Sequence, residues 1–547
     1  MLAKEAFPAI KTTSRALQQH LFLLLQNSQT YKQLEQIHTQ IIINAFSHKN
    51  FILVNLLSSY ISSGHFRKAH EIFNQANSPS TTAWNQILRG YLMTQLPRES
   101  IKLYSRMVGS GVKEEEYTYS YVVTACVKAM ALREGMQVHG RVLCSGFCGN
   151  VVVNTNLVNF YGVGGGEGLL REARRVFDEM SERNVVTWNC LLSGYVRWGD
   201  IGKACGVFDE MVEKNVVSWT IMIVGFVRNG KFKRSLSLFY DMWRGCVKFD
   251  RVTLVAVLSA CAELGDLRLG RWVHSYYIRG NLDVENDEEL VSLHNALVHM
   301  YASCGLVDES FIVFKAMPRR STVSWTSMIM GFAKQGRGKE AIEVFRWMQG
   351  CGDNDVRPDG ITLLSVLCAC SHAGLVEEGR YFFNCIQTWG IQPMIEHYGC
   401  MVDILSRAGH LDEAHRLVTS MSMKPNDAVW GALLGGCKIH KNAELASLVA
   451  QKLVGELHHD QAAGYLVLLS NVYATAKKWQ DVVDVRRIIV EDRVKKTPGQ
   501  SWIQIDGIIQ NFMAGEQKNI DAHLVYRILS DVSREGSTFD AQLGIEE

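Results

Sequence analysis

The chain has 547 residues, of which 47% are hydrophobic and 20% are charged, and its formal net charge is +2 at pH 7. This length exceeds what one compact core accommodates, while the composition is ordinary for a folded protein. The near-neutral charge gives no global signature of a nucleic-acid binder, although a repeat array can carry a local basic strip. No apolar run is long enough to span a bilayer, so no membrane partner is expected.

The first two dozen residues carry three basic side chains and several hydroxyls against a single acid, Glu5. This composition is compatible with an organelle transit segment over residues 1–30. The alternative, which the residues favour equally, is the first helix of a helical array. Residues 31–49 are expected to be the second helix of a degenerate partial repeat.

From residue 50 the chain repeats itself, and two consecutive copies read NVVTWNCLLSGYVRWGD and NVVSWTIMIVGFVRNGK, with Trp188 and Trp219 31 residues apart. Trp188 is the first residue of an apolar stripe with the helical spacing i, i+3, i+4 and i+7. Gly199 and Asp200 then predict a turn, and Ala204 is the first residue of a second stripe with the same spacing. Each copy is therefore predicted to be an antiparallel helix pair that its neighbours must cover, and the chain to be an all-α solenoid.

A longer period lies above the single repeat. Intervals of 104 to 106 residues separate Trp84 from Trp188, Trp219 from Trp325 and Trp325 from Trp430. The array is therefore built of triplets of slightly different repeats. Their predicted bounds are 50–80, 81–115, 116–150, 151–184, 185–215, 216–250, 251–290, 291–321, 322–359, 360–394 and 395–426.

The 14 cysteines contain no Cys-x-x-Cys. Four of them recur at one place in their repeats, so we interpret them as reduced thiols in the core: Cys126, Cys261, Cys370 and Cys437. Cys368, Cys370 and His372 look like a metal cluster, but on a helix the two cysteines point to nearly opposite sides, which favours core packing.

Two glycine-rich stretches resemble phosphate loops. GFVRNGKF lacks Ser or Thr after Lys231 and is predicted to be the turn between two helices. The glycines from Gly162 to Gly168 follow no strand and are predicted to form a loop.

The repeat length, the VVSWN-like openings and the triplets resemble the pentatricopeptide repeats of the plant P-L-S class. HYGCMVDILSRAGHLDEA, from His397, resembles the last S-type repeat, and GYLVLLSNVYATAKKW and PGQSWIQIDGIIQNFMAG resemble the extension motifs that follow it. The resemblance implies a right-handed superhelical solenoid with a repeat array over 50–426, two extension (E) motifs over 427–496 and an E+-like extension over 497–547. Gln500 stands where the family usually has Cys, and Leu524 stands where it usually has Pro.

Catalytic members of that family end in a zinc deaminase domain, the DYW domain, whose chemistry needs His-x-Glu and Pro-Cys-x-x-Cys. None of the 17 histidines is followed two residues later by Glu, and too few residues follow PGQSW for such a domain. We therefore expect no enzymatic activity, cofactor, metal or small-molecule substrate in this chain.

We number each repeat so that Val185 is the first residue of its repeat. The fifth and the last residue of each repeat are then expected to face the same groove, where neighbouring repeats meet. In the stronger repeats both carry short polar side chains, as reading the edge of an RNA base requires. The alternative for the last position is helix capping. The base-reading pairs are Asn85 with Glu115, Thr155 with Asn184, Asn189 with Asn215, Thr220 with Asp250, Asn295 with Ser321, and Thr326 with Asp359.

Two further positions fit RNA. The second residue of the repeat is often valine, whose stiff apolar side chain could wedge between two bases. The residues at this position are Val186, Val217 and Val323. The thirteenth residue is basic and could meet successive phosphates in Arg197, Arg228 and Lys334, although each of these cations could also be an ordinary solvated side chain.

In the family that the chain resembles, Asn with Asp favours U, Asn with Asn or Ser favours C, Thr with Asn favours A, and Thr with Asp favours G. The resemblance therefore implies 5′-YNAYGNYGNN-3′ for the repeats from 81–115 to 395–426. We expect the chain to bind single-stranded organellar RNA, to specify a C-to-U editing site, and to recruit a deaminase-bearing partner through its C-terminal extension. The expected organelle is the mitochondrion, with the chloroplast as the alternative.

Two other functions stay open. An RNA-binding factor for splicing, stability or translation would use the same groove. A helical-repeat scaffold for protein partners would instead carry apolar or charged residues at the fifth position, and it would not bind RNA.

Overall fold

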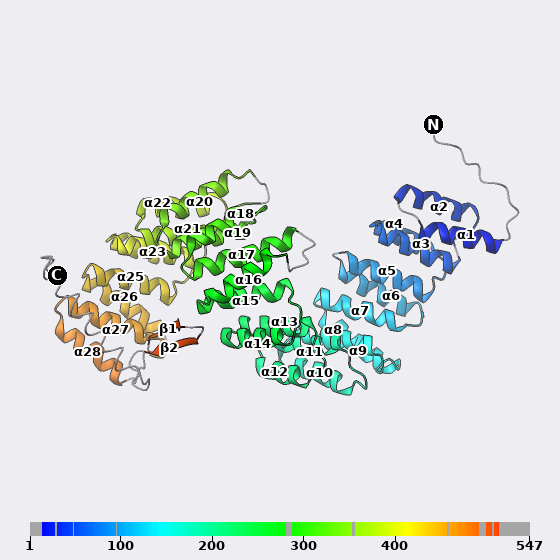
Figure 1. Cartoon of the computed structure of the whole chain (residues 1–547), viewed down its shortest axis with the longest axis horizontal. Coiled ribbons are helices and arrows are strands. Elements are labelled where there is room, and N and C mark those ends of the chain that lie inside the picture. Colours follow the sequence, from blue (N-terminus) through cyan, green and yellow to red (C-terminus); the bar gives the residue numbers. More distant parts are fainter. Residues whose placement is uncertain are drawn as a thin grey trace. The chain divides into compact units, whose positions relative to one another are not determined.

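A computed structural model describes residues 14–27, 30–47, 49–94, 96–280, 287–352, 356–456, 459–491, 499–505 and 508–513. The chain divides into two compact parts, an N-terminal half of residues 1–249 and a C-terminal half of residues 250–547. Both are stacks of helix pairs, in which we call the first helix of each pair the A helix and the second the B helix (Figure 1).

The N-terminal half contains seven helix pairs within the described residues. Its A helices are α1 (Ser14–Gln26), α3 (Asn50–Ser62), α5 (Thr81–Met93), α7 (Glu116–Ala129), α9 (Val151–Gly164), α11 (Val185–Arg197) and α13 (Val216–Arg228). Its B helices are α2 (Tyr31–Ile43), α4 (Phe66–Gln75), α6 (Pro97–Gly109), α8 (Leu132–Cys144), α10 (Gly166–Glu179), α12 (Ile201–Glu210) and α14 (Phe232–Arg244).

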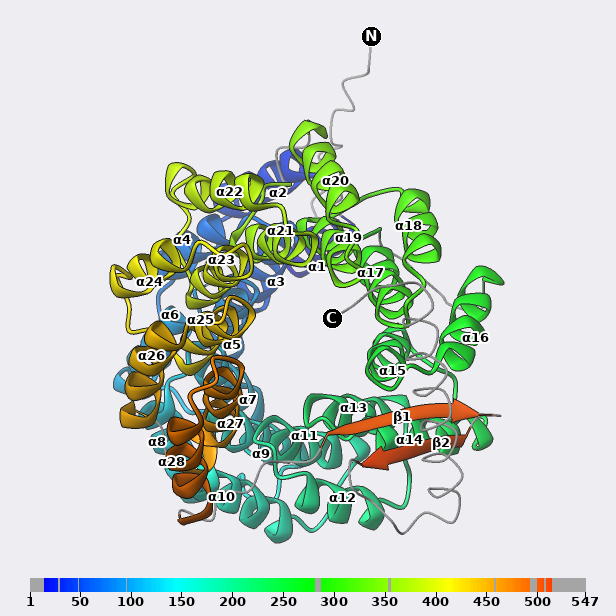
Figure 2. The ribbon, with the colours of Figure 1, turned by 90° about the vertical axis from the view of Figure 1, so that its left-hand side faces the viewer.

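The C-terminal half contains seven more pairs and one hairpin within the described residues. Its A helices are α15 (Arg251–Leu264), α17 (Asp287–Ser303), α19 (Thr322–Lys334), α21 (Gly360–Ala373), α23 (Ile395–Arg407), α25 (Asp427–Ile439) and α27 (His459–Thr475). Its B helices are α16 (Leu267–Ile278), α18 (Val307–Ala316), α20 (Gly338–Gly350), α22 (Val376–Thr388), α24 (Leu411–Thr419), α26 (Ala443–Glu456) and α28 (Trp479–Glu491). From α15 to α24, the A helices line the inner side of an arc and the B helices its outer side (Figure 2).

The helical-repeat prediction is confirmed, with one addition at the C-terminal end. Strands β1 (Gln500–Ile505) and β2 (Ile508–Met513) pair antiparallel, so that Gln500 faces Met513 and Ile505 faces Ile508. This hairpin lies in the segment predicted to be an E+-like extension. The rest of that segment, Leu524 included, lies outside the described residues.

The N-terminal segment adds a helix to the predicted partial repeat. Helix α1 precedes α2, and its Leu21 and Leu25 are buried in the core of the N-terminal half. The helix pair at the start of the array is therefore complete, and residues 14–26 behave as its first helix. Residues 1–13, the remainder of the possible transit segment, lie outside the described residues.

The two glycine-rich stretches differ in outcome. The turn prediction for GFVRNGKF is confirmed, because α13 ends at Arg228, α14 begins at Phe232, and Gly230 has a φ of +67° between them. The loop prediction for residues 162–168 is wrong, because α9 continues through Gly164 and α10 begins at Gly166. Only Gly165 separates the two helices, with a φ of +85° that L-residues rarely adopt.

The recurring tryptophans have a structural reason. All of them except Trp430 pack edge-to-face on a phenylalanine of the preceding B helix, with ring centroids 4.7 to 5.1 Å apart, an arrangement that the quadrupoles of the two rings favour. The pairs are Trp84 with Phe73, Trp188 with Phe177, Trp219 with Phe208 and Trp325 with Phe314. Each of these aromatic pairs therefore packs one repeat against the next.

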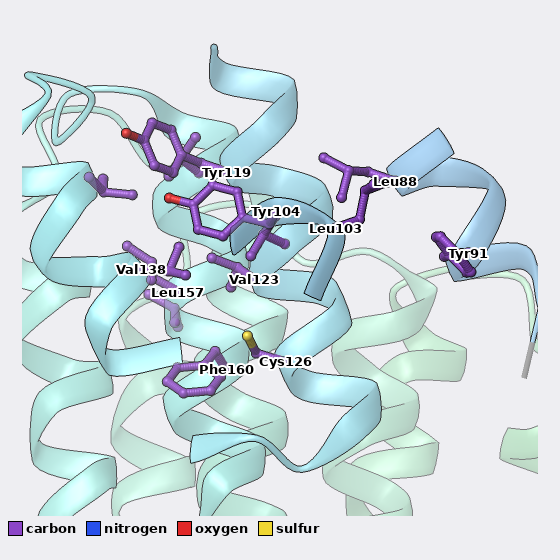
Figure 3. Close-up of a cluster of buried hydrophobic side chains, with 14 of the residues drawn as sticks. Leu88, Tyr91, Leu103, Tyr104, Tyr119, Val123, Cys126, Val138, Leu157 and Phe160 are labelled. Atoms are coloured by element: carbon purple, nitrogen blue, oxygen red, sulfur yellow. The ribbon is translucent and has the colours of Figure 1, made fainter. Parts of the chain in front are cut away.

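The four recurring cysteines lie in the cores of the two halves, Cys126 in the N-terminal half and the other three in the C-terminal half. In the N-terminal half, Cys126 of α7 lies close to Phe160 of α9, while Tyr119, also of α7, lies near Tyr104 of α6 (Figure 3). Cys126, Cys261, Cys370 and Cys437 are all fully buried and free, as predicted for small core residues. Burial raises the pKa of the Cys126 thiol to about 12, so this thiol is inert at neutral pH.

In three places within the described residues, a histidine of a B helix contacts the hydroxyl of a tyrosine in the next A helix. His139 Nδ1 lies 2.8 Å from the hydroxyl of Tyr161, and His38 pairs with Tyr60 and His274 with Tyr301 at 3.1 and 2.9 Å. Burial lowers the pKa of all three histidines below its usual value. The folded protein therefore holds them neutral.

We expect this to make the protein less stable in mild acid. Since the folded pKa values lie below the usual value of about 6.5, the unfolded chain takes up protons first as the pH falls. The three pairs contribute to the free energy of unfolding above about pH 6.5, and this contribution is lost as the pH falls through the folded pKa values. The midpoint of thermal unfolding should fall between pH 7.5 and 5.5, and less steeply in a His139→Gln variant. An equal slope in both proteins would contradict this role of His139.

Candidate nucleic-acid interface

The last residue of each predicted repeat, except Leu290 inside α17, is the N-cap of the next A helix. Asn184 Oδ1 accepts from the backbone N–H of Thr187 at 2.9 Å, Asn215 Oδ1 from that of Ser218 at 3.0 Å, and Asp359 Oδ1 from that of Thr362 at 2.8 Å. Ser321 and Asp250 cap α19 and α15 in the same way. The capping alternative is thus confirmed for these residues, and it fixes the orientation of each side chain.

Capping uses only one terminal atom of each side chain. Within the described residues, Asn184 Nδ2, Asn215 Nδ2 and Asp359 Oδ2 have no hydrogen-bond partner, and all three side chains are exposed. Each asparagine therefore presents a donor to solvent, and the aspartate presents an acceptor. One residue can be both a cap and a reader, so the two interpretations do not compete.

A buried hydroxyl that the sequence interpretation missed connects the predicted pairs. It belongs to the third residue of the next A helix, and every member of this set is 0% exposed: Thr118, Thr187, Ser218, Ser324 and Thr362. Ser218 Oγ lies 2.7 Å from Asn189 Oδ1 and 3.0 Å from Asn215 Oδ1. The recurring Ser or Thr three residues into each helix was the sequence signal for it.

The same bridge joins two other pairs. Thr326 Oγ1 lies 2.8 Å from Thr362 Oγ1, which lies 2.8 Å from Asp359 Oδ1. In the repeat 151–184, Thr187 Oγ1 lies 2.7 Å from Thr155 Oγ1 and 3.0 Å from Asn184 Oδ1.

At the first strong repeat, Thr118 Oγ1 donates to Asn85 Oδ1 at 2.8 Å and accepts from the backbone N–H of Glu115 at 3.1 Å. The bridge there reaches the backbone of the last-position residue.

Two pairs are also in direct contact. Asn189 Nδ2 donates to Asn215 Oδ1 at 3.2 Å, and Asn295 Nδ2 to Ser321 Oγ at 3.5 Å. Thr220 lies in the N-terminal half and Asp250 in the C-terminal half. Thr220 is buried, and Asp250 Oδ1 accepts from the backbone N–H of Thr253 at 2.7 Å.

The fifth-position side chains are more buried than a groove-lining position suggests. Asn85, Thr155, Asn189 and Thr220 are 5% to 8% exposed, so a ligand can reach only one edge of each. Asn295 Oδ1 is buried and has no hydrogen-bond partner within the described residues. Such an unpaired acceptor is costly unless a ligand supplies a donor.

The second residue of the A helices forms an exposed apolar row. The three predicted valines are 50% to 60% exposed, and in the helices from α7 to α21 four more residues at the same position are 44% to 58% exposed. The added members are Tyr117, Val152, Val252 and Ile361. The prediction named only valines in the strongest repeats and therefore missed the other four.

The three predicted cations lie at the C-terminal end of their A helices. Arg197, Arg228 and Lys334 are exposed, and none of them forms an ion pair with another described residue. Their charges are therefore available to an anion.

One pocket brings the predicted positions together. A cavity of about 260 Å³ in the C-terminal half is lined by Val323, Thr326 and Lys334 of α19 and by Asp359 at the cap of α21. Ile361 of the apolar row and His299 of α17 line it as well. This cavity offers an apolar wall, an acceptor, a hydroxyl and a cation within one small volume, which suits a planar polar ring that carries a phosphate.

Within the described residues, no helix has both the length and the apolar character needed to cross a bilayer.

Comparison with protein families finds two kinds of match. The model described as PPR repeat matches residues 82–112, 165–185, 186–216, 217–247, 292–321, 323–353 and 396–424. The model described as E motif matches residues 440–504.

Known proteins match over nearly the whole chain. A pentatricopeptide repeat-containing protein of Arabidopsis thaliana is 37% identical over 535 residues, which cover 94% of this chain and 81% of the relative. Another from that plant, named chloroplastic/mitochondrial, is 34% identical over 93% of this chain and 76% of its own. A third, named mitochondrial, is 38% identical over 92% of this chain and 75% of its own.

Among solved structures, the crystal structure of the pentatricopeptide repeat protein PPR10 from maize has a similar fold. The TM-score is 0.53 at 16% sequence identity, and the match covers 89% of this chain and 80% of that one.

Proposed function

Because the chain belongs to the pentatricopeptide repeat family, we propose that it binds single-stranded RNA along its A helices, one nucleotide per repeat, and so specifies a C-to-U editing site in an organellar transcript. The observation that carries the proposal is the cavity at Val323, Thr326, Lys334 and Asp359. It contains one member of each class of contact that single-stranded RNA recognition needs: an apolar surface for the base, polar groups for its edge and a cation for the phosphate.

The capping geometry gives a physical reason for base choice. On their Watson–Crick edges, guanine and uracil present a ring N–H, whereas adenine and cytosine present a bare ring nitrogen. Asp359 has only an acceptor left after capping, so it suits guanine or uracil. Asn184 and Asn215 have a donor left, so they suit adenine or cytosine.

Serine fits the same scheme. Ser321 Oγ accepts the capping bond from the backbone N–H of Ser324 and lies 3.2 Å from Ser324 Oγ. With Ser324 as the donor in that second contact, the Ser321 hydroxyl hydrogen is left to donate to the bare nitrogen of a cytosine. The buried, unpaired Asn295 Oδ1 can accept from the exocyclic amino group of that base. The last residue of the repeat would therefore distinguish bases with a ring N–H from bases with a bare ring nitrogen. The fifth residue would distinguish purines from pyrimidines, as in the family code.

The editing part of the proposal is supported by the E motif at residues 440–504 and by the sequence, which lacks the His-x-Glu and Cys-x-x-Cys of a zinc deaminase. A deaminase carried by another protein would then act on the C that this chain marks. The related proteins named as mitochondrial or chloroplastic/mitochondrial support an organellar site of action. Between the two organelles we propose the mitochondrion.

Sequencing of organellar transcripts from a line in which the gene is disrupted tests the editing proposal. We expect one or a few C positions, each a few nucleotides downstream of a match to 5′-YNAYGNYGNN-3′, to remain unedited. If editing is unchanged while a transcript is lost, left unspliced or not translated, the chain is an RNA-binding factor of another kind. If the purified chain binds no RNA, the scaffold function is the better account.

The three cations should account for a measurable part of the salt dependence of RNA binding. Replacing Arg197, Arg228 and Lys334 together by Gln should lower the slope of log K against log salt by about 0.7 per cation on a single strand. The measurement is a titration by fluorescence anisotropy at four salt concentrations. The matched control is Arg346→Gln, an exposed cation of a B helix that forms no ion pair with another described residue, and its slope should equal that of the wild type.

A further inference from the structure

The sequence places Cys368 beside Cys370, but the fold gives it a different neighbour. Cys370 is fully buried in the core, whereas Cys368 faces the adjacent A helix, where its sulfur lies 3.4 Å from the sulfur of Cys400. Both thiols are partly exposed and neither is in a disulfide. Two thiols from repeats 32 residues apart in the chain are therefore already in van der Waals contact.

A second contact holds the two helices in this register. The hydroxyl of Ser371 donates to Asp403 Oδ2, and Asp403 also accepts from Arg407 Nε at 2.9 Å. Ser371 and Asp403 each follow their cysteine by three residues, so the two contacts are successive rungs between parallel helices. The thiols are thus brought together by the packing of α21 on α23 and not by a chance rotamer.

We propose that Cys368 and Cys400 form an oxidisable dithiol site that closes to an intramolecular disulfide when the protein meets a peroxide. Forming the bond needs the sulfurs to approach from 3.4 Å to about 2.05 Å, a shift that side-chain rotation and a small helix movement supply. The disulfide would tie the repeats 360–394 and 395–426 to one another.

The two thiols have unequal roles in this reaction. Their hydrogen-bonding contact lowers the pKa of the Cys368 thiol and raises the pKa of the Cys400 thiol, so Cys368 is the one that forms the thiolate. The Cys368 thiolate attacks one oxygen of the peroxide, the O–O bond breaks, and hydroxide leaves and takes up the proton that Cys368 released. The Cys400 thiol then attacks the sulfenic acid on Cys368, the S–O bond breaks, and water leaves. Two thiols are oxidised to one disulfide, and hydrogen peroxide is reduced to two waters.

The other cysteines do not share this arrangement. Burial raises the pKa of the Cys370 thiol to about 12, which suppresses its thiolate. Cys144, Cys148, Cys246 and Cys351 are exposed, and among the described residues none of them has a thiol within contact distance. We expect these four to react with an oxidant without closing an internal cross-link.

The test uses the full chain with the four exposed cysteines changed to Ser. After mild peroxide treatment and blocking of free thiols, trypsin yields the peptides 347–380 and 381–407, because Pro358 protects the bond after Arg357. We expect these two peptides to be joined by a link that dithiothreitol releases. Mass spectrometry of the digest without reductant reads out the link.

The two peptides carry matched controls. The first also contains Cys370 and the second also contains Cys385. The link should persist in the Cys370→Ser and Cys385→Ser variants and disappear in the Cys368→Ser and Cys400→Ser variants. A native circular-dichroism melt of every variant shows that it is folded. Absence of the link in the folded parent protein with the four Ser substitutions, or its persistence without Cys368 or Cys400, would overturn the proposal.

Discussion

Replacing Asn215 by Asp is expected to change the base preferred by the repeat 185–215 from C to U. Asn215 caps α13 through Oδ1, and Asp caps equally well, so the fold and the contact with Asn189 are kept. The free atom changes from the donor Nδ2 to the acceptor Oδ2, which suits the ring N–H of uracil and repels the bare nitrogen of cytosine. Discrimination between the two RNAs should reverse by about 1–3 kcal/mol, measured by gel shift with single-base variants of the predicted string.

The reciprocal change and a matched control sharpen this experiment. Asp359→Asn should change the preference of the repeat 322–359 from G to A by the same reasoning. Asn442→Asp makes the isosteric change at the N-cap of the B helix α26, where Leu445 N–H donates to Oδ1 at 3.0 Å, and should leave every base preference unchanged. If Asn215→Asp weakens binding to C and U equally, the cap residue does not read the base edge, and the register of the proposal is wrong.

Removing the Phe314 ring should produce the largest loss of stability. Phe314 of α18 is 2% exposed and packs on Trp325 of α19 with ring centroids 4.9 Å apart. Phe314→Ala removes this contact and leaves a cavity that rigid helices cannot close, at a cost of about 3–5 kcal/mol in the free energy of unfolding. Because Val323 and Thr326 lie on α19, weaker RNA binding should accompany the loss.

Thermal unfolding and amide hydrogen exchange together check this prediction. In a repeat array each helix pair contacts only its neighbours, so the gain in exchange should centre on α18 and α19 and leave the N-terminal half unchanged. Tyr381→Ala removes an aromatic ring of similar size from the B helix α22 that is 62% exposed, and its midpoint should stay close to that of the wild type. A Phe314→Ala protein as stable as the Tyr381→Ala protein would show that the aromatic pair does not hold the repeats together.

Much of the fold could be predicted because its period is written in the sequence. Apolar stripes at 3.6-residue spacing, interrupted by glycine turns, predicted helix pairs, and the repeated tryptophans marked where one pair meets the next. The prediction failed where glycine was taken as a sufficient signal for a loop, since Gly162, Gly164, Gly166 and Gly168 are all helical. Gly162 and Gly164 lie against Gly194 and Leu132, and this packing outweighs the low helix propensity of glycine, whereas Gly166 and Gly168 are exposed in the first turn of α10.

The candidate site was predicted in its residues but not in its connections. Sequence alone weighed base reading against capping for the last position of each repeat, because both use short polar side chains. The structure shows capping through one atom, with the other atom left free, a division that depends on how α11, α13 and α21 begin. The recurring hydroxyls and the additional members of the apolar row were visible as repeat positions in the sequence, but the contacts from Ser218 to Asn189 and from Cys368 to Cys400 join residues about one repeat apart, which no local pattern reveals.

The order of residues by itself determined the family, the helix-pair architecture and the register of the polar, apolar and basic positions, because all of these follow from local periodicity. Only the tertiary structure decided which atoms remain free for a ligand and which thiols touch. Those outcomes depend on the distance and rotation between neighbouring helices, which are set by how their buried side chains pack against one another.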